Sequence, residues 1–183
     1  MLWEAFLAGL IIGWLRNGKI KYLSRIPLPG WPLILIAVLI QLIIWIDFSI
    51  STYFLAPAYP ILHTFSFAIL VIFFFLQGKN AGFLIVGLGI LLNLLVITAN
   101  HGKMPVDSTH MPAEVAEELA AGEKSPFHKI ITEETWLAFL GDVISLPYKN
   151  NQLLSIGDIV IAAGIIIVIQ QGMQGKKRKK KWR

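Results

Sequence analysis

Long apolar stretches alternate along the chain with short polar connectors. An α-helix rises about 1.5 Å per residue, so about 20 residues cross the hydrocarbon core of a membrane. The first and last stretches are short by this measure. The pattern predicts an all-α protein, a polytopic membrane bundle of five transmembrane helices with an external helical loop. The five apolar stretches are residues 2–15, 31–50, 59–76, 81–99 and 156–170.

Composition agrees with this pattern. Of the 183 residues, 56% are hydrophobic and only 15% are charged, which is too few polar side chains to cover a soluble domain of this length. Cysteine is absent, so disulfides, thiolate metal sites and cysteine nucleophiles are excluded. We expect one membrane domain over residues 1–175, followed by a short tail at 176–183.

The charge of the connectors predicts an orientation. Residues 16–25 carry four basic side chains and no acid, and the tail 176–183 is almost wholly basic. The connector 100–154 instead holds eight of the eleven acidic residues. The positive-inside rule then places the N-terminus outside the cytoplasmic membrane and the C-terminus inside. A polybasic tail beside a span is typical of an anchor on anionic inner-leaflet lipid, so nucleic acid is not the expected partner.

The connector 100–154 contains two patterns typical of helices. The first begins after Thr109, which can cap it, and Gly122 ends it. The second lies within residues 125–141, with Ser125 or Thr132 as cap and Gly141 as stop. We expect the apolar residues near its end to lie at the membrane interface.

Titratable residues within the apolar stretches all fall near their predicted outer ends. Asp47, His63 and Asp158 lie within about a turn of those ends, and Asn100 follows the fourth stretch. Because ionisable groups inside a membrane are costly, their depth is informative. The inner halves of the stretches are apolar apart from Gln41 near the middle. This asymmetry favours a site open to the outside and disfavours a polar path across the membrane.

Asp142 and Asp158 each follow a glycine and allow two interpretations. In the structural one, Ser155 and Asp158 form a helix-capping arrangement, and Asp142 is a solvated acid after Gly141. In the functional one, the two carboxylates lie together, share one proton and activate water for hydrolysis. His128 is then the best candidate for an acid–base partner. The histidines lack short metal-ligand spacing, so we expect no metal and no cofactor.

Two family resemblances bear on these residues. The order of the two aspartates is similar to that in the aspartic type II lipoprotein signal peptidases, although the asparagines and the arginine of their motifs are missing. A second series of motifs comprises Asn100, 102–106 (GKMPV), His128, 140–142 (LGD), 146–147 (LP) and 155–158 (SIGD). In these motifs and over its whole length the chain resembles a bacterial integral-membrane family, domain of unknown function 5317, with His101 a departure. That resemblance implies a five-span membrane protein and no particular activity.

Together these patterns predict an integral membrane protein with a polar site facing outwards. We expect a binding or accessory role, with a lipid or a membrane protein as ligand. The alternatives are a membrane-embedded aspartic-type hydrolase of lipid or lipoprotein, and a small transporter. The residues expected to do chemistry are Asp142, Asp158 and His128, and those expected to line the site are Asn100, Met104, Pro105, Asp47 and His63.

Overall fold

A computed structural model describes residues 1–78, 80–146 and 152–175 of the chain, and it is mostly helical as predicted. The apolar stretches form five helices, of which α6 runs four residues beyond the predicted end. Four of them, counting α3 with the turn before it, are long and apolar enough to cross a membrane, whereas α1 has 14 residues. The five helices are α1 (Leu2–Leu15), α2 (Pro32–Ser49), α3 (Tyr59–Leu76), α4 (Ala81–Ala99) and α6 (Ile156–Gln174).

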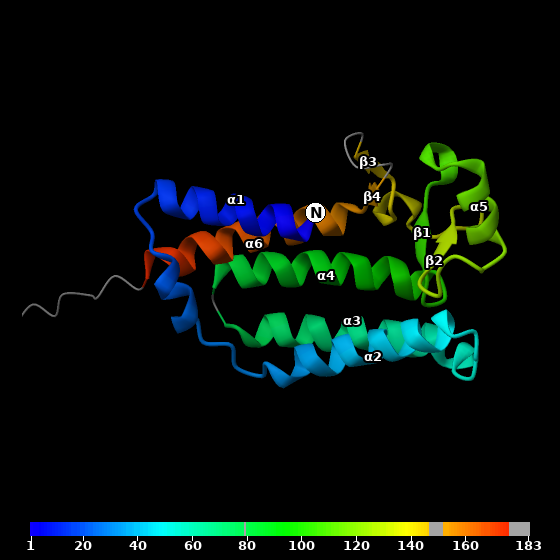
Figure 1. Ribbon diagram of the computed structural model, residues 1–183, viewed down its shortest axis with the longest axis horizontal. Coiled ribbons are helices and arrows are strands. Elements are labelled where there is room, and N and C mark those ends of the chain that lie inside the picture. Colours follow the sequence, from blue (N-terminus) through cyan, green and yellow to red (C-terminus); the bar gives the residue numbers. More distant parts are fainter. Residues whose placement is uncertain (79, 147–151, 176–183) are drawn as a thin grey trace, which may run out of the picture.

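The helices pack side by side in the order α1, α6, α4, α3, α2 (Figure 1). Helix α4 lies in the middle, and half of its length is buried by its neighbours. Helix α6 returns along it, so the last helix in the sequence separates α1 from α4. This order brings the start of α6 beside the end of α4, where two of the predicted site residues lie.

Glycines allow α4 and α6 to approach each other closely. A Cβ on Gly89 would lie 2.5 Å from the carbonyl oxygen of Gly157, and one on Gly157 would lie 1.9 Å from Oδ1 of Asn93. Small residues at such contacts let helix backbones touch and bring their polar groups within hydrogen-bond distance. The α4–α6 contact is therefore tight next to Asn93.

Residues 100–146 and 152–154 lie over one end of the helices and are here called the cap (Figure 1). Strand β1 pairs in parallel with β2, and β3 pairs antiparallel with β4. Met104 and Leu140 of the cap are buried against Val96 and Ile97 of α4. The elements of the cap are β1 (Met104–Val106), η3 (Ser108–His110), α5 (Ala113–Ala120), β2 (His128–Ile130), η4 (Ala138–Leu140), β3 (Ile144–Leu146) and β4 (Gln152–Leu154).

The prediction of a second helix in the cap is wrong. Residues 125–141 form strand β2, a turn and the short 3-10 helix η4 instead. Neither predicted cap residue begins a helix: Ser125 bonds within its own turn, and Thr135 accepts from the Thr132 N–H. The two β-branched residues after Lys129 suit an extended strand, and β1 offers the edge on which they pair.

The first predicted cap helix exists but is shorter than expected. It is α5, and Thr109 does not cap it, since this residue lies in η3, where its N–H donates to Asp107. The stop at Gly122 is confirmed: this residue has φ of +78° just beyond the helix. In the left-handed region a glycine avoids the steric cost of a Cβ.

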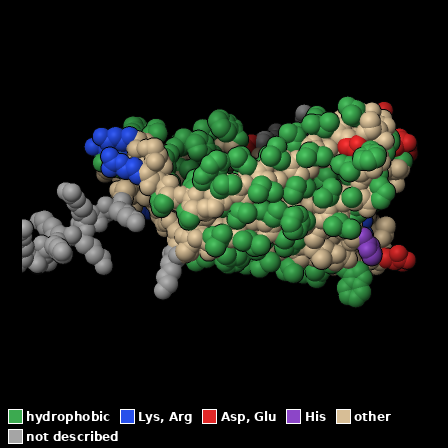
Figure 2. All heavy atoms as spheres, turned by 90° about the horizontal axis from the view of Figure 1, so that it is seen from below, with side chains coloured by type: hydrophobic (Ala, Val, Ile, Leu, Met, Phe, Trp, Pro, Cys, Tyr) green, Lys and Arg blue, Asp and Glu red, His purple; other side chains and the backbone are tan. Residues whose placement is uncertain are grey.

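The two ends of the molecule differ in charge. Lys and Arg side chains gather at the end formed by α1 and the 3-10 helix η1 (Ile20–Arg25), and Asp and Glu side chains gather at the cap end (Figure 2). The 3-10 helix η2 (Ala56–Ala58) joins α2 to α3 near the cap. The predicted basic tail, 176–183, and the residues 147–151 lie outside the described part of the chain.

Candidate functional site

A cavity of about 220 Å³ lies where the cap meets α2, α3, α4 and α6. It brings together five of the eight predicted site residues: His63, Met104, His128, Asp142 and Asp158. The remaining three, Asp47, Asn100 and Pro105, do not line it. The complete lining is Gln41, His63, Phe67, Asn93, Ile97, Met104, Phe127, His128, Asp142 and Asp158.

Strand β1 brings His128 and Asp142 to the same place from segments that are distant in sequence. On one edge of β1, His128 pairs with Met104. On the other edge, Asp142 bridges to Val106, and its N–H donates to the carbonyl of Pro105 over 2.8 Å. Three residues of strand thus position both candidate catalytic side chains of the cap.

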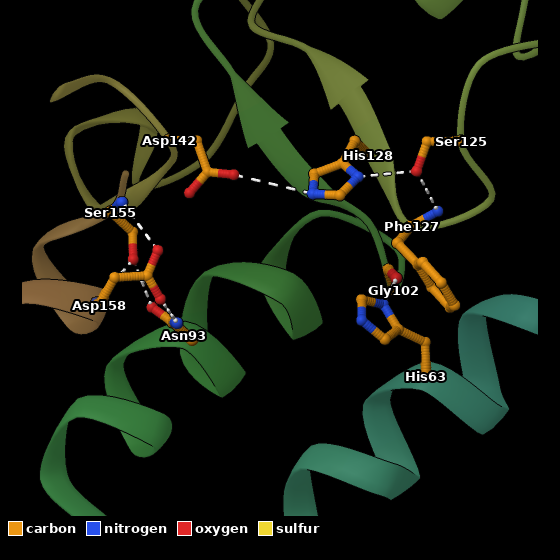
Figure 3. Close-up of polar contacts among 9 residues, drawn as sticks. All are labelled: His63, Asn93, Gly102, Ser125, Phe127, His128, Asp142, Ser155 and Asp158. Atoms are coloured by element: carbon orange, nitrogen blue, oxygen red, sulfur yellow. Dashed lines mark hydrogen bonds and ion pairs between the residues drawn. The ribbon is translucent and has the colours of Figure 1, made fainter. Parts of the chain in front are cut away.

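Asp158 lies at the start of α6 in the predicted capping box. The Ser155 hydroxyl accepts from the Asp158 N–H over 2.9 Å, and the carboxylate accepts from the Ser155 N–H over 3.3 Å. The Asn93 amide closes a ring (Figure 3): it donates to Asp158 over 3.0 Å and accepts from the Ser155 hydroxyl over 2.9 Å. The capping prediction is confirmed, and the same carboxylate also lines the cavity.

Asp142 is held less tightly than Asp158. Its Oδ2 lies 3.8 Å from Nε2 of His128, which is beyond hydrogen-bond distance (Figure 3). Burial, and then the negative charge of Asp158, raise the pKa of Asp142 to about 7. Burial, and then the proximity of His63, lower the pKa of His128. The negative charge of Asp158 opposes this shift without reversing it. Near neutral pH, Asp142 is therefore partly protonated and partly ionised, while His128 is uncharged.

The other edge of the His128 ring is oriented by Ser125. The Ser125 hydroxyl accepts from the Phe127 N–H over 3.2 Å and lies 2.7 Å from Nδ1 of His128 (Figure 3). Because that hydroxyl already accepts one bond, we assign its own hydrogen to Nδ1. The Nε2–H of His128 then faces Asp142.

His63 closes the opposite side of the cavity from α3. Its Nδ1 donates to the Gly102 carbonyl over 2.7 Å, so Nε2 carries the lone pair when the ring is neutral. The ring lies against Phe67 and Phe127, with centroids 5.2 and 4.7 Å away. Gly102 has φ of +78°, and a Cβ there would lie 2.4 Å from Pro60. Glycine is therefore required where the chain leaves α4.

Two polar residues in the deeper part of the cavity were not among the predicted site residues. Gln41 donates to the Ser66 hydroxyl over 3.0 Å, and Ser66 donates to the His63 carbonyl. Asn93 is buried and joins the ring at Asp158. Their signal in the sequence is that each is a lone amide within an apolar stretch. Because Gln41 lines it, the cavity reaches about the middle of α2.

The three predicted site residues outside the cavity hold the fold together. Asp47 joins the end of α2 to the next segment, since its carboxylate accepts from the Leu55 N–H, the Tyr59 hydroxyl and the Thr52 hydroxyl. Asn100 binds both the N–H and the carbonyl of Trp136, which fixes the cap to α4. Pro105 is fully buried within β1.

Within the described ranges, no group of three His, Asp or Glu side chains is placed to hold a metal ion. The polar lining of the cavity comprises two carboxylates, two imidazoles and two amides, and the rest of the lining is apolar.

A model of a family of unknown function, DUF5317, matches residues 25–170. The chain belongs to this family. The match includes every residue that lines the cavity. An uncharacterized protein of Thermotoga maritima is 29% identical over 169 residues, which cover 91% of this chain and 89% of that protein. No solved structure matches the chain.

Proposed function

We propose that this protein spans the cytoplasmic membrane five times and binds a small ligand in the cavity beneath its external cap. The N-terminus lies outside and the C-terminus inside, with α1 as a short first span. The binding of ligand, rather than catalysis, is the primary role, and any accessory role follows from it.

The single observation that carries this proposal is the cavity itself. It is lined by polar groups from α2, α3, α4, α6 and the cap, together with four apolar side chains. A pocket that combines apolar surface with a few converging polar groups is typical of a ligand site. The acidic cap end and the basic opposite end support the orientation (Figure 2).

The absence of native cysteine provides a direct test. Met104 lines the cavity, so we expect the thiol of the Met104→Cys variant to react with a small, charged, membrane-impermeant thiol reagent added outside intact cells. The matched control is Val106→Cys in the same strand, which is equally buried but does not line the cavity. Equal reaction rates at the two positions would show that the cavity is not accessible from outside. Reaction from the cytoplasmic side alone would reverse the proposed orientation.

A hydrolase is the second candidate, because Asp142 and Asp158 line one cavity and Asp142 retains a proton near neutral pH. Against it, both oxygens of Asp158 already accept hydrogen bonds from Asn93 and Ser155, which limits that carboxylate as a base. Release of fatty acid or peptide from lipid or lipopeptide vesicles, abolished by Asp142→Asn, would establish the hydrolase. Unchanged release in the variant would exclude Asp142 as its catalytic acid.

Two further proposals concern the inner side of the membrane. A transporter needs a polar route, and Gln41 takes the cavity only to about the middle of α2. The basic tail would bind anionic inner-leaflet lipid. Tighter binding of the whole chain than of a chain lacking 176–183 to the inner face of anionic vesicles would support that anchor.

A further inference from the structure

We propose that the ligand of the cavity is a protonated primary amine with a short apolar tail. This inference rests on the proposed binding function and specifies its ligand. It comes from the hydrogen-bonding capacity, the charge and the size of the cavity between the cap and the helices.

Three polar side chains of the cavity each donate a hydrogen bond within the protein, and the Nε2–H of His128 faces the carboxylate of Asp142. The Asn93 amide donates to Asp158, the Gln41 amide to Ser66, and Nδ1 of His63 to the Gly102 carbonyl. These side chains also provide acceptor atoms, among them Oε1 of Gln41 and Nε2 of His63. A ligand that complements them must bring N–H or O–H donors.

The charge of the lining selects a cation among such donors. Asp142 and Asp158 both line the cavity, and among the described lining residues there is neither lysine nor arginine. An ammonium group provides three N–H donors and one positive charge, and hydrogen bonds to carboxylates are stronger than neutral ones. An anionic ligand would meet these carboxylates without a compensating charge.

The remaining lining defines the tail of the ligand. Phe67, Ile97, Met104 and Phe127 provide apolar surface beside the acceptors. An apolar cavity of about 150 Å³ holds benzene, so about 220 Å³ admits a ligand only a little larger. An ammonium group with four to eight carbons, on the order of that size, fits this volume.

Binding of a cation should release a proton from the site. The titratable groups that face Asp142 are His128 from β2, Asp158 from α6 and, across the cavity, His63 from α3. Because the pKa of Asp142 is about 7, the carboxylate is mostly protonated at pH 6 and mostly ionised at pH 8. If the ligand binds only the ionised form, its affinity rises roughly tenfold between these pH values.

The test is calorimetric titration of the purified full-length protein in detergent with three probes. n-Butylammonium carries charge and N–H donors, tetramethylammonium carries charge alone, and 1-butanol carries an uncharged donor. An alkylammonium is fully protonated at both pH values, since its pKa is close to that of lysine, about 10.4. We expect n-butylammonium to bind at least about tenfold more tightly than either other probe, and more tightly at pH 8 than at pH 6.

Matched variants assign the effect to the cavity. Asp142→Asn should weaken n-butylammonium binding by about ten- to hundredfold and abolish its pH dependence, because the charged acceptor is lost. Glu133→Gln makes the same change of net charge at an exposed position of the cap and should leave binding unchanged. Equal loss in both variants would make the interaction a general charge effect and overturn the proposal.

The remaining outcomes separate this inference from the function on which it rests. Equally tight binding of 1-butanol or of tetramethylammonium would overturn the amine assignment and leave a ligand cavity in place. Failure of all three probes, with Met104→Cys still reactive from outside, would also reject the amine class alone. Failure of the probes together with an unreactive Met104→Cys would reject both proposals.

Discussion

The two sides of the cavity are built differently. On the helix side, Asn93, Ser155 and Asp158 form a closed ring of hydrogen bonds between 2.9 and 3.3 Å. On the cap side, Asp142 and His128 face each other across 3.8 Å. One side has its polar atoms satisfied and its geometry fixed, whereas the other retains a group that can gain or lose a proton. Under the proposed binding function, the helix side would position a ligand and the cap side would respond to it.

The structural origin of this difference lies in what supports each side. The ring is held by the direct backbone contact of α4 with α6, in which Gly89 and Gly157 touch. The cap side depends on β1, a strand of three residues with short neighbours. Polar networks with every member satisfied are rigid, and removing one member leaves its partners unpaired at a cost in free energy. Substitutions should therefore be far more costly on the helix side.

The largest effect is expected from Gly157→Ala. The added Cβ would overlap Oδ1 of Asn93 at 1.9 Å and the Gly89 carbonyl at 2.7 Å, so the helices must separate and the ring must break. Overpacking together with the lost hydrogen bonds should lower the free energy of unfolding by about 3 kcal/mol or more. Titration of the solubilised protein with a denaturing detergent measures this loss.

The control for this substitution is Gly122→Ala in the cap. Gly122 has φ of +78°, but a Cβ there would meet no atom within 4 Å. Only the left-handed backbone is strained, at a cost of about 1 kcal/mol. If the two substitutions proved equally costly, close packing of α4 and α6 would not be what fixes the helix side.

The second effect, of intermediate size, compares the two aspartates directly. Asp158→Asn loses acceptor capacity in the capping box and should destabilise the protein by about 1–2 kcal/mol. Asp142→Asn at pH 8 removes a charge whose raised pKa shows that burial disfavours it, so stability should increase. Opposite signs in unfolding titrations at pH 8 are the expected result. A similar loss in both variants would mean that Asp142 is also held in a satisfied network.

The third effect is a change in how stability depends on pH. Asp142 has a folded pKa of about 7, above its ordinary value, so its contribution is present below about pH 4 and is lost as pH rises towards 7. His128 has a lowered pKa, so its contribution is present above about pH 6.5 and is lost as pH falls. The two slopes oppose each other, and the unmodified chain should change little between pH 4 and 6.5.

Replacing His128 exposes the slope of Asp142. In His128→Gln, the free energy of unfolding should fall by at least about 1 kcal/mol as pH rises from 4 to 7, because only the aspartate remains. Solvent screens this slope little, since the side chain of Asp142 is only 13% exposed. Unfolding titrations at four pH values measure the slope. A flat profile in this variant, as in the unmodified chain, would show that the two groups do not titrate against each other.

Local pattern was sufficient to predict the helix side. Long apolar stretches gave the five helices, and Ser155 with Asp158 gave the capping box, because both signals lie within a few consecutive residues. The pairing of Asp158 with Asn93 was not predicted, since it depends on how closely α4 and α6 approach. A glycine in an apolar stretch does not by itself indicate which helix it will touch.

The cap side could be predicted only in its residue types. Asp142 and His128 were expected near Asp158 because of their predicted outward location, and they line the same cavity. The strands that bring them together were missed: Met104–Val106 and His128–Ile130 are three residues each, too short for a period-two pattern. Asp47 and Asn100 are also polar and buried, but turn contacts consume their side chains, a distinction that requires the three-dimensional structure.

The smallest effect is expected from Ser125→Ala, which leaves His128 in place and changes only what orients its ring. In Ser125→Ala, Nδ1 loses the hydroxyl 2.7 Å away, and the Nε2–H tautomer that faces Asp142 should lose population. Stability should fall by only about 0.5 kcal/mol, because Ser125 is partly exposed and solvent can replace the bond. Nitrogen chemical shifts of the imidazole, measured at pH 6 and pH 8, report the tautomer directly.

Ser125→Thr keeps the hydroxyl and is the control for this change. It should preserve the tautomer, whereas Ser125→Ala should shift it most at pH 6, where Asp142 is largely protonated and attracts the Nε2–H least. At pH 8 the carboxylate alone should restore much of the Nε2–H form. An unchanged tautomer in Ser125→Ala at both pH values would mean that Asp142 orients the ring without help. The cap side would then contain one adjustable pair and not a chain of three residues.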